Sequence, residues 1–173
     1  MRQHLLASGL VAALLVGGTL PALANGGKAK GLHLVASVEG IAFTADIDPY
    51  LFELTSAGGK YRVIRIKLIN RGSKPVALSS TDDTIRVEID DQAVAGIIDL
   101  PRLDAPFWDG LSSSLRRDLV YPRTVDANEE ESVFVYVPIA EVKAAPKQVQ
   151  IQFSIKTLAS PAVLRSPVAA AKS

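Results

Sequence analysis

The chain has 173 residues, with 19 Lys and Arg against 18 Asp and Glu, and it contains no cysteine. A nearly balanced charge argues against nucleic acid or an anionic membrane as the main partner, because both attract a net basic surface. The lack of cysteine excludes disulfides, thiolate chemistry and cysteine-ligated metals, and we expect no cofactor.

The first 24 residues have the order of a secretory signal peptide. One positive charge, Arg2, precedes an apolar run from Leu5 to Leu20, then Pro21 and the small-residue triplet Ala22-Leu23-Ala24. The apolar run is shorter than the roughly 18 residues that a spanning helix needs. We therefore expect cleavage after this triplet, a periplasmic or secreted mature protein, and no membrane insertion after cleavage.

The mature chain is expected to contain a single domain. Cleavage removes one basic residue and leaves 18 basic against 18 acidic residues, so self-repulsion is small and weak self-association is easy. We expect a flexible lead-in at 25–30, a β domain at 31–158 and a mobile tail at 159–173, where Ala, Ser and Pro are frequent and periodicity is weak.

Strand patterns fill the β domain. The clearest runs from Lys147 to Lys156, where Val149, Ile151, Phe153 and Ile155 alternate with polar residues, so one face is expected to be buried. In chain order, the other expected strands are Leu32 to Val38, Ile41 to Ala45, Tyr61 to Ile69, Val76 to Ser80, Ile85 to Asp90, Leu119 to Thr124 and Ser132 to Val137. The last has apolar residues on both faces, which favours a central strand. Turns are expected at Gly58-Gly59, Asn70 to Ser73, Asp90-Asp91 and Asp126 to Asn128.

Two segments have helical rather than strand patterns. Phe107, Leu111, Leu115 and Leu119 are spaced by four residues, which predicts one amphipathic helix of about three turns that joins two strands. A shorter helical turn is expected at 139–145, before Pro146.

The order of strands and turns resembles bacterial exported immunoglobulin-like domains of uncharacterised function. The resemblance rests on Asn70 and Gly72 after a strand, on Asp90 and Asp91, and on the acidic run 129–131 before the strand ending at Pro138. It implies an all-β fold, an immunoglobulin-like antiparallel β-sandwich with one short crossover helix, preceded by the cleaved signal peptide. The Cys-Trp-Cys core of immunoglobulin domains is missing, so no site residue is carried over.

Candidate catalytic groups are few. His33 is the one histidine left after cleavage, and we interpret it as a solvent-facing strand residue because no nucleophile elbow accompanies it. Acidic groups occur at Asp46 and Asp48, Asp82 and Asp83, Asp90 and Asp91, and Glu129 to Glu131. None matches a calcium loop, so we interpret them mainly as turn residues. Arg116 and Arg117 are interpreted as part of a solvated helix face.

The remaining candidate site is a partner-binding one, formed by Phe107, Trp108, Asp109 and Arg116. Trp108 either seals the rim of the core or is an exposed anchor, since aromatic and Arg residues dominate interface hot spots. We expect a non-enzymatic exported binding or accessory module that contacts an envelope or extracellular protein. The alternatives are a secreted proteinase inhibitor and a carbohydrate-binding module.

Overall fold

The computed structural model describes residues 31–47, 52–53, 60–142 and 146–165. The expected signal peptide, the lead-in and the Gly58-Gly59 turn lie outside these residues. Within the described ranges, no helix is both long and apolar enough to cross a membrane.

Strands are the most frequent secondary structure in the described residues, as the sequence predicts. In chain order the elements are β1 Leu32–Val38, β2 Ile41–Ile47, β3 Phe52–Glu53, β4 Tyr61–Asn70, β5 Val76–Ala77, β6 Thr84–Ile89, β7 Gln92–Val94, α1 Leu100–Leu103, α2 Ala105–Asp109, α3 Ser113–Leu119, β8 Thr124–Val125, β9 Glu130–Pro138, the 3-10 helix η1 Ile139–Glu141, β10 Val149–Ser154 and β11 Ala162–Arg165. All the strand pairs are antiparallel, and the all-β class is confirmed.

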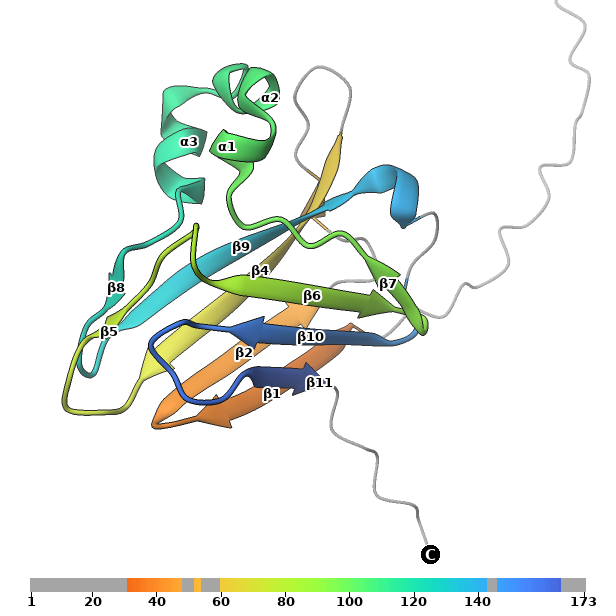
Figure 1. The fold of residues 1–173 in the computed structure, drawn as a ribbon. Coiled ribbons are helices and arrows are strands. Elements are labelled where there is room, and N and C mark those ends of the chain that lie inside the picture. Colours follow the sequence, from red (N-terminus) through yellow and green to blue (C-terminus); the bar gives the residue numbers. More distant parts are fainter. Residues whose placement is uncertain (1–30, 48–51, 54–59, 143–145, 166–173) are drawn as a thin grey trace, which may run out of the picture.

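Nine of the strands belong to one sheet. Its path is β3-β4-β2-β1-β11-β10-β6-β7, and β9 pairs with β4. After β7 the chain returns to β9, where Ile97 and Tyr136 each donate a backbone N–H to the other's carbonyl, at 3.0 and 2.8 Å. The sheet therefore curls into a barrel-like form (Figure 1). A sandwich of two packed sheets was expected, and the immunoglobulin-like arrangement is not confirmed.

Alternating residues of the strands fill the interior of this curled sheet. In β10, Val149, Ile151 and Phe153 are buried, and Ile155 just beyond it is buried too. Val133, Val135 and Val137 of β9 face the same core. This confirms the buried face predicted for β10, and both strands follow the two-residue period of a strand.

The outer face of β4 and β9 carries a second core. Tyr61 and Val63 of β4 and Tyr136 of β9 are buried there, against residues of the three helices. The prediction of a central strand was therefore wrong. Among the described residues, β4 is the one strand that pairs along the length of β9, and the second apolar face of β9 is buried by the helices instead.

One strand lies within the segment expected to be a mobile tail. Ala162 and Leu164 of β11 are fully buried, and β11 lies between β10 and β1 in the sheet. The expectation was wrong for 162–165, because a four-residue strand is too short to give a clear period beside Ala, Ser and Pro.

Two of the predicted turns, at Asp90-Asp91 and at Asn70, are present and are stabilised by local backbone conformation and side-chain hydrogen bonds. Asp90 and Asp91 have positive φ, +49° and +63°, and close the two-residue hairpin between β6 and β7. The amide of buried Asn70 donates to the carbonyls of Lys74 and Val125 at 2.8 and 3.0 Å. Asn70 thus fixes its own turn and links it to β8.

Candidate functional site

Residues Leu100–Val120 form a helical cap made of α1, α2 and α3. The sequence predicts one helix from Phe107 to Leu119, and this prediction was wrong. α2 ends at Asp109 with Gly110 as its C-cap, and a separate helix, α3, begins after Ser112, whose Oγ accepts the Leu115 N–H at 3.3 Å. Serine at this position satisfies an otherwise unpaired backbone donor of the first turn.

Apolar contacts hold the cap on the outer face of the sheet. Leu100, Leu111 and Leu119 are buried against the tyrosines of β4 and β9. The Phe107 and Tyr61 rings meet edge-on, with centroids 5.1 Å apart. The cap therefore covers the outer face of β4 and β9.

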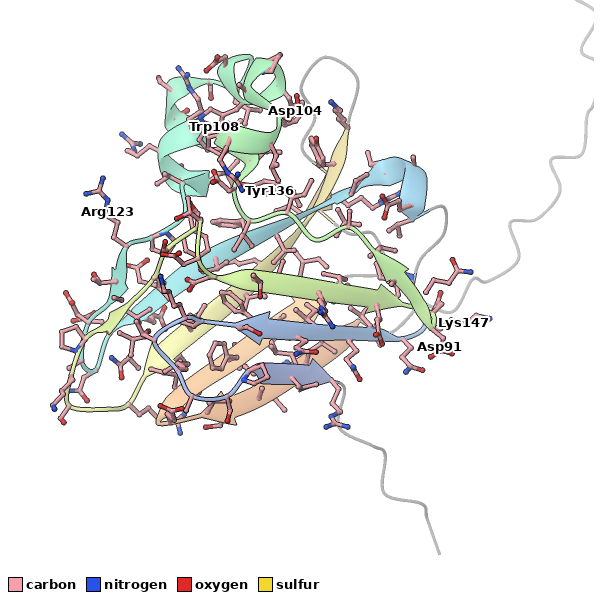
Figure 2. The ribbon with its side chains drawn as sticks, in the orientation of Figure 1. Asp91, Asp104, Trp108, Arg123, Tyr136 and Lys147 are labelled. Carbon is pink, nitrogen blue, oxygen red and sulfur yellow. The ribbon has the colours of Figure 1, made fainter. Side chains whose placement is uncertain are left out.

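Polar contacts fix the cap at two further points. The Tyr136 hydroxyl donates to the carbonyl oxygen of Leu119 at 3.1 Å, inside the protein. Asp104, between α1 and α2, accepts hydrogen bonds from the Tyr61 hydroxyl at 2.7 Å and from the Lys60 ammonium. Figure 2 shows Asp104 and Trp108 on the cap, with Tyr136 beneath them.

These contacts also change the titration of the groups involved. The hydrogen bond from Lys60, followed by that from Tyr61, lowers the pKa of Asp104. Burial, followed by the hydrogen bond to Asp104, raises the pKa of Tyr61 to about 12. The cap is therefore joined to β4 by an ionised carboxylate and a neutral phenol at neutral pH.

Three of the four exposed large apolar residues that the structure describes lie on the cap. Leu103 in α1 is 58% exposed, Leu115 in α3 is 39% exposed, and Val120 after α3 is 53% exposed; the fourth, Val35 in β1, is 39% exposed. Scattered single apolar residues are normal on a surface, but several on one short segment are typical of a contact site.

The four predicted site residues all lie on the cap. Phe107 and Trp108 are half-buried and pack against the second core. Asp109 and Arg116 are brought together across the break between α2 and α3, with 3.4 Å between the Arg116 guanidinium and the Asp109 carboxylate. Trp108 is therefore partly a core residue, while Asp109 is exposed and Arg116 is half-buried.

Sequence reasoning missed the exposed leucines. Leu115 was expected in the buried stripe, but the helix is interrupted at Gly110 and Leu115 in α3 is 39% exposed. Leu103 lies in a helix that no period predicts, because α1 has only four residues. The only local signals are Asp99 as N-cap and Pro101 in the first turn.

Two of the acidic groups that the sequence singles out contact other residues in the described chain. Buried Asp83 accepts hydrogen bonds from the Tyr121 hydroxyl at 2.7 Å and from the Ser79 and Lys156 backbone N–H groups at 2.8 and 2.9 Å. His33 lies beside Asp46 on the exposed face, with Nδ1 and Oδ1 2.6 Å apart. No group of three or more potential metal ligands is found among the described residues.

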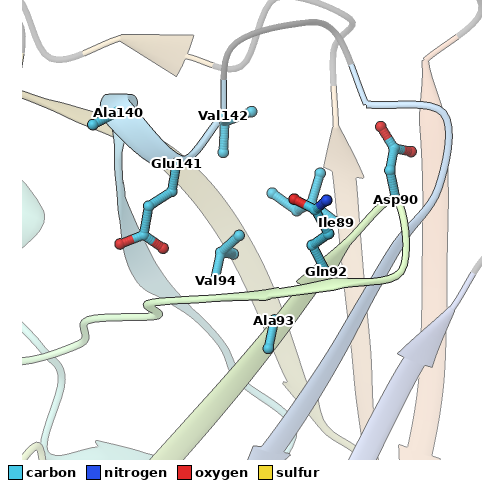
Figure 3. Close-up of a pocket in the computed structure, with 8 residues that line it drawn as sticks. All are labelled: Ile89, Asp90, Gln92, Ala93, Val94, Ala140, Glu141 and Val142. Atoms are coloured by element: carbon cyan, nitrogen blue, oxygen red, sulfur yellow. The ribbon is translucent and has the colours of Figure 1, made fainter.

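A cleft of about 600 Å³ lies where the curled sheet fails to close, between β7 on one side and η1 on the other (Figure 3). Val94 and Val142 give it apolar walls, and Asp90 and Glu141 add two carboxylates. Glu141 Oε2 accepts the Ala95 N–H at 2.7 Å and so ties η1 to the chain after β7. We call this the seam cleft.

No family model matches this chain, and no curated protein or solved structure does either.

Proposed function

We propose that the protein is an exported, non-enzymatic binding or accessory module, and that its helical cap contacts another protein of the cell envelope or the extracellular space. The observation that carries this proposal is the position of Leu103, Leu115 and Val120, three exposed apolar residues on one short helical segment. Export is proposed from the signal-peptide pattern of residues 1–24. An immunoglobulin-like topology is not part of the proposal, since one curled sheet holds nine strands.

The chemistry of the cap supports a protein partner. Trp108 and Arg116 belong to the residue types most frequent in interface hot spots, and both are half-buried, so they lose little side-chain freedom on binding. The cap is also held at several fixed points on the sheet. A rigid surface with exposed apolar groups favours association because less entropy is lost.

The alternative functions receive less support. Carbohydrate binding commonly uses a flat exposed aromatic platform, yet the described tyrosines, Tyr61, Tyr121 and Tyr136, are occupied in hydrogen bonds through their hydroxyls. A proteinase inhibitor would present an exposed loop to a protease cleft, and nothing in the described loops favours that role.

The proposal can be tested by site-specific photocrosslinking in the producing cell. A crosslinking amino acid at Leu115 is expected to give one discrete adduct, whereas the same amino acid at Val35 gives none. The two positions are equally exposed, at 39%, so accessibility alone predicts equal labelling. The adduct at Leu115 should weaken when Leu103 and Val120 are both changed to Ser in a protein that still folds.

Equal adducts at Leu115 and Val35, or none at any cap position, would contradict a binding role for the cap. Robust hydrolase turnover that depends on one carboxylate would contradict the non-enzymatic class. Export is checked separately by intact mass, with Asn25 expected as the mature N-terminus.

A further inference from the structure

We infer that the seam cleft binds an extended peptide segment of a partner protein, which adds as a strand to the free edge of β7 and places a Lys or Arg side chain beside Asp90 and Glu141. This site is separate from the helical cap and does not depend on the function proposed for it.

The sequence explains why β7 and the end of β9 do not pair at the seam cleft. Ile97 and Tyr136 form a hydrogen-bonded pair, which begins an antiparallel ladder between the chain after β7 and β9. Two residues beyond Tyr136 comes Pro138, which has no N–H to donate, and the chain then turns into η1. β7 is therefore left without a neighbouring strand on its outer side among the described residues.

The hairpin geometry determines which backbone groups of β7 face the cleft. Ile89 and Gln92 close the two-residue turn, so they form a hydrogen-bonded pair, and the next pair, Glu88 and Ala93, is a non-hydrogen-bonded one. The N–H and C=O of Ala93 consequently point away from β6, and Ala93 lines the cleft. An exposed edge of this kind is a template for an added strand.

The charges of the cleft indicate what the added strand carries. Asp90 and Glu141 line it, and no Lys or Arg of the described residues does. Asp90 Oδ1 accepts the Lys147 and Gln148 backbone N–H groups, both at 2.9 Å, and Glu141 Oε2 accepts the Ala95 N–H. Neither carboxylate takes part in an ion pair within the described chain, so both charges remain unneutralised there. A basic side chain in the added strand would complement both, and complementary charge selects the partner. The volume of about 600 Å³ lies within the usual range of ligand sites.

The test is an NMR titration of the mature protein with the peptide acetyl-Thr-Lys-Val-Lys-Thr-amide and with its counterpart in which both Lys are Glu. Saturable shifts of the Ala93 and Ala95 amides are expected with the basic peptide, at an affinity at least about tenfold higher than that of the acidic one. Asp90→Asn with Glu141→Gln keeps one acceptor oxygen on each side chain but removes the charges, and should abolish most of this preference.

Two changes test the backbone pairing. Ala93→Pro removes the outward N–H without removing a bond to β6, and should weaken binding at least about tenfold. A peptide with an N-methylated Val tests the same pairing from the ligand side and leaves the protein unaltered, so it remains decisive if Ala93→Pro does not fold. The inference is overturned if both changes leave the affinity unaltered, if neither peptide binds saturably, or if the seam amides shift only with protein concentration, which would make a second copy the occupant.

Discussion

Two single substitutions, Tyr121→Phe and Tyr136→Phe, each remove one hydroxyl group. Comparing their losses of stability measures how much more a hydrogen bond to a charged acceptor stabilises this fold than one to a neutral acceptor. The Tyr121 hydroxyl donates to the buried carboxylate of Asp83 at 2.7 Å, and the Tyr136 hydroxyl donates to the neutral carbonyl of Leu119 at 3.1 Å. Both rings pack against apolar neighbours, and both substitutions delete the same atom. The principal difference between the variants is the charge of the acceptor.

The two losses are expected to differ by about a factor of two. A hydrogen bond to a charged group contributes about 1.5 to 3 kcal/mol, whereas a neutral one contributes about 0.5 to 1.5 kcal/mol. In Tyr121→Phe, Asp83 keeps its bonds from the Ser79 and Lys156 backbone, so the loss should stay within the charged range rather than exceed it. Burial, followed by the hydrogen bond to Asp83, raises the pKa of Tyr121, so the hydroxyl is protonated at neutral pH.

Urea unfolding followed by two signals provides the measurement. Trp108 is the single tryptophan and lies on the cap, so its fluorescence reports the cap, while far-UV circular dichroism reports the sheet. Coincident transitions justify a two-state free energy of unfolding for each variant. A loss for Tyr136→Phe equal to or larger than that for Tyr121→Phe would refute the reasoning from acceptor charge.

Three further predictions follow from the core, the composition and the cap. Ile151→Asp should unfold the domain, since an unpaired charge in a fully buried position costs several kcal/mol, whereas Gln150→Asp should be mild; thermal melts that show equal effects would mean the buried face is misassigned. A chelator or a reductant should leave the thermal midpoint unchanged, because the chain has no cysteine and no metal cluster is described; a midpoint that rises with added calcium would contradict this. The pKa of Asp104 is lowered in the folded state, so its contribution is present above its ordinary value of 3.8 and is lost as the pH falls through the folded-state pKa. The pKa of Tyr61 is raised to about 12, so its contribution is present below 10 and is lost as the pH rises from 10 toward 12. Trp108 fluorescence should report both changes, and Asp104→Asn should remove the acid one.

Periodicity predicted the strands well where one face is buried and the other is wet. β10 shows this most clearly, because Val149, Ile151 and Phe153 alternate with polar residues and are all buried. The turn at Asp90 and Asp91 was also predictable, since these residue types tolerate the positive φ that the hairpin requires. Local physics is sufficient for both features.

The features that the sequence did not predict depend on contacts between distant residues. Apolar residues on both faces of β9 do not show what covers its outer face. In the structure the helices of the cap cover that face, and β4 pairs along the length of β9. Curling of the sheet depends on the pairing of Ile97 with Tyr136, which no local pattern indicates. The exposure of Leu115 depends on one break at Gly110, which outweighs the four-residue spacing.

The place of β11 in the sheet has a consequence for the order of folding. β3, β4, β2, β1 and β9 form one group of paired strands, β10, β6 and β7 form another, and β11 is the strand that joins β1 to β10. β11 comes last along the described chain. In a chain that is synthesised or exported N-terminus first, the edges of β1 and β10 therefore stay unpaired until Ala162–Arg165 follows. Pairing between such distant segments is slow, since loop closure precedes any gain from contacts. We therefore expect the two groups to join late in folding, which would suit a protein that we propose to be carried across a membrane before it folds.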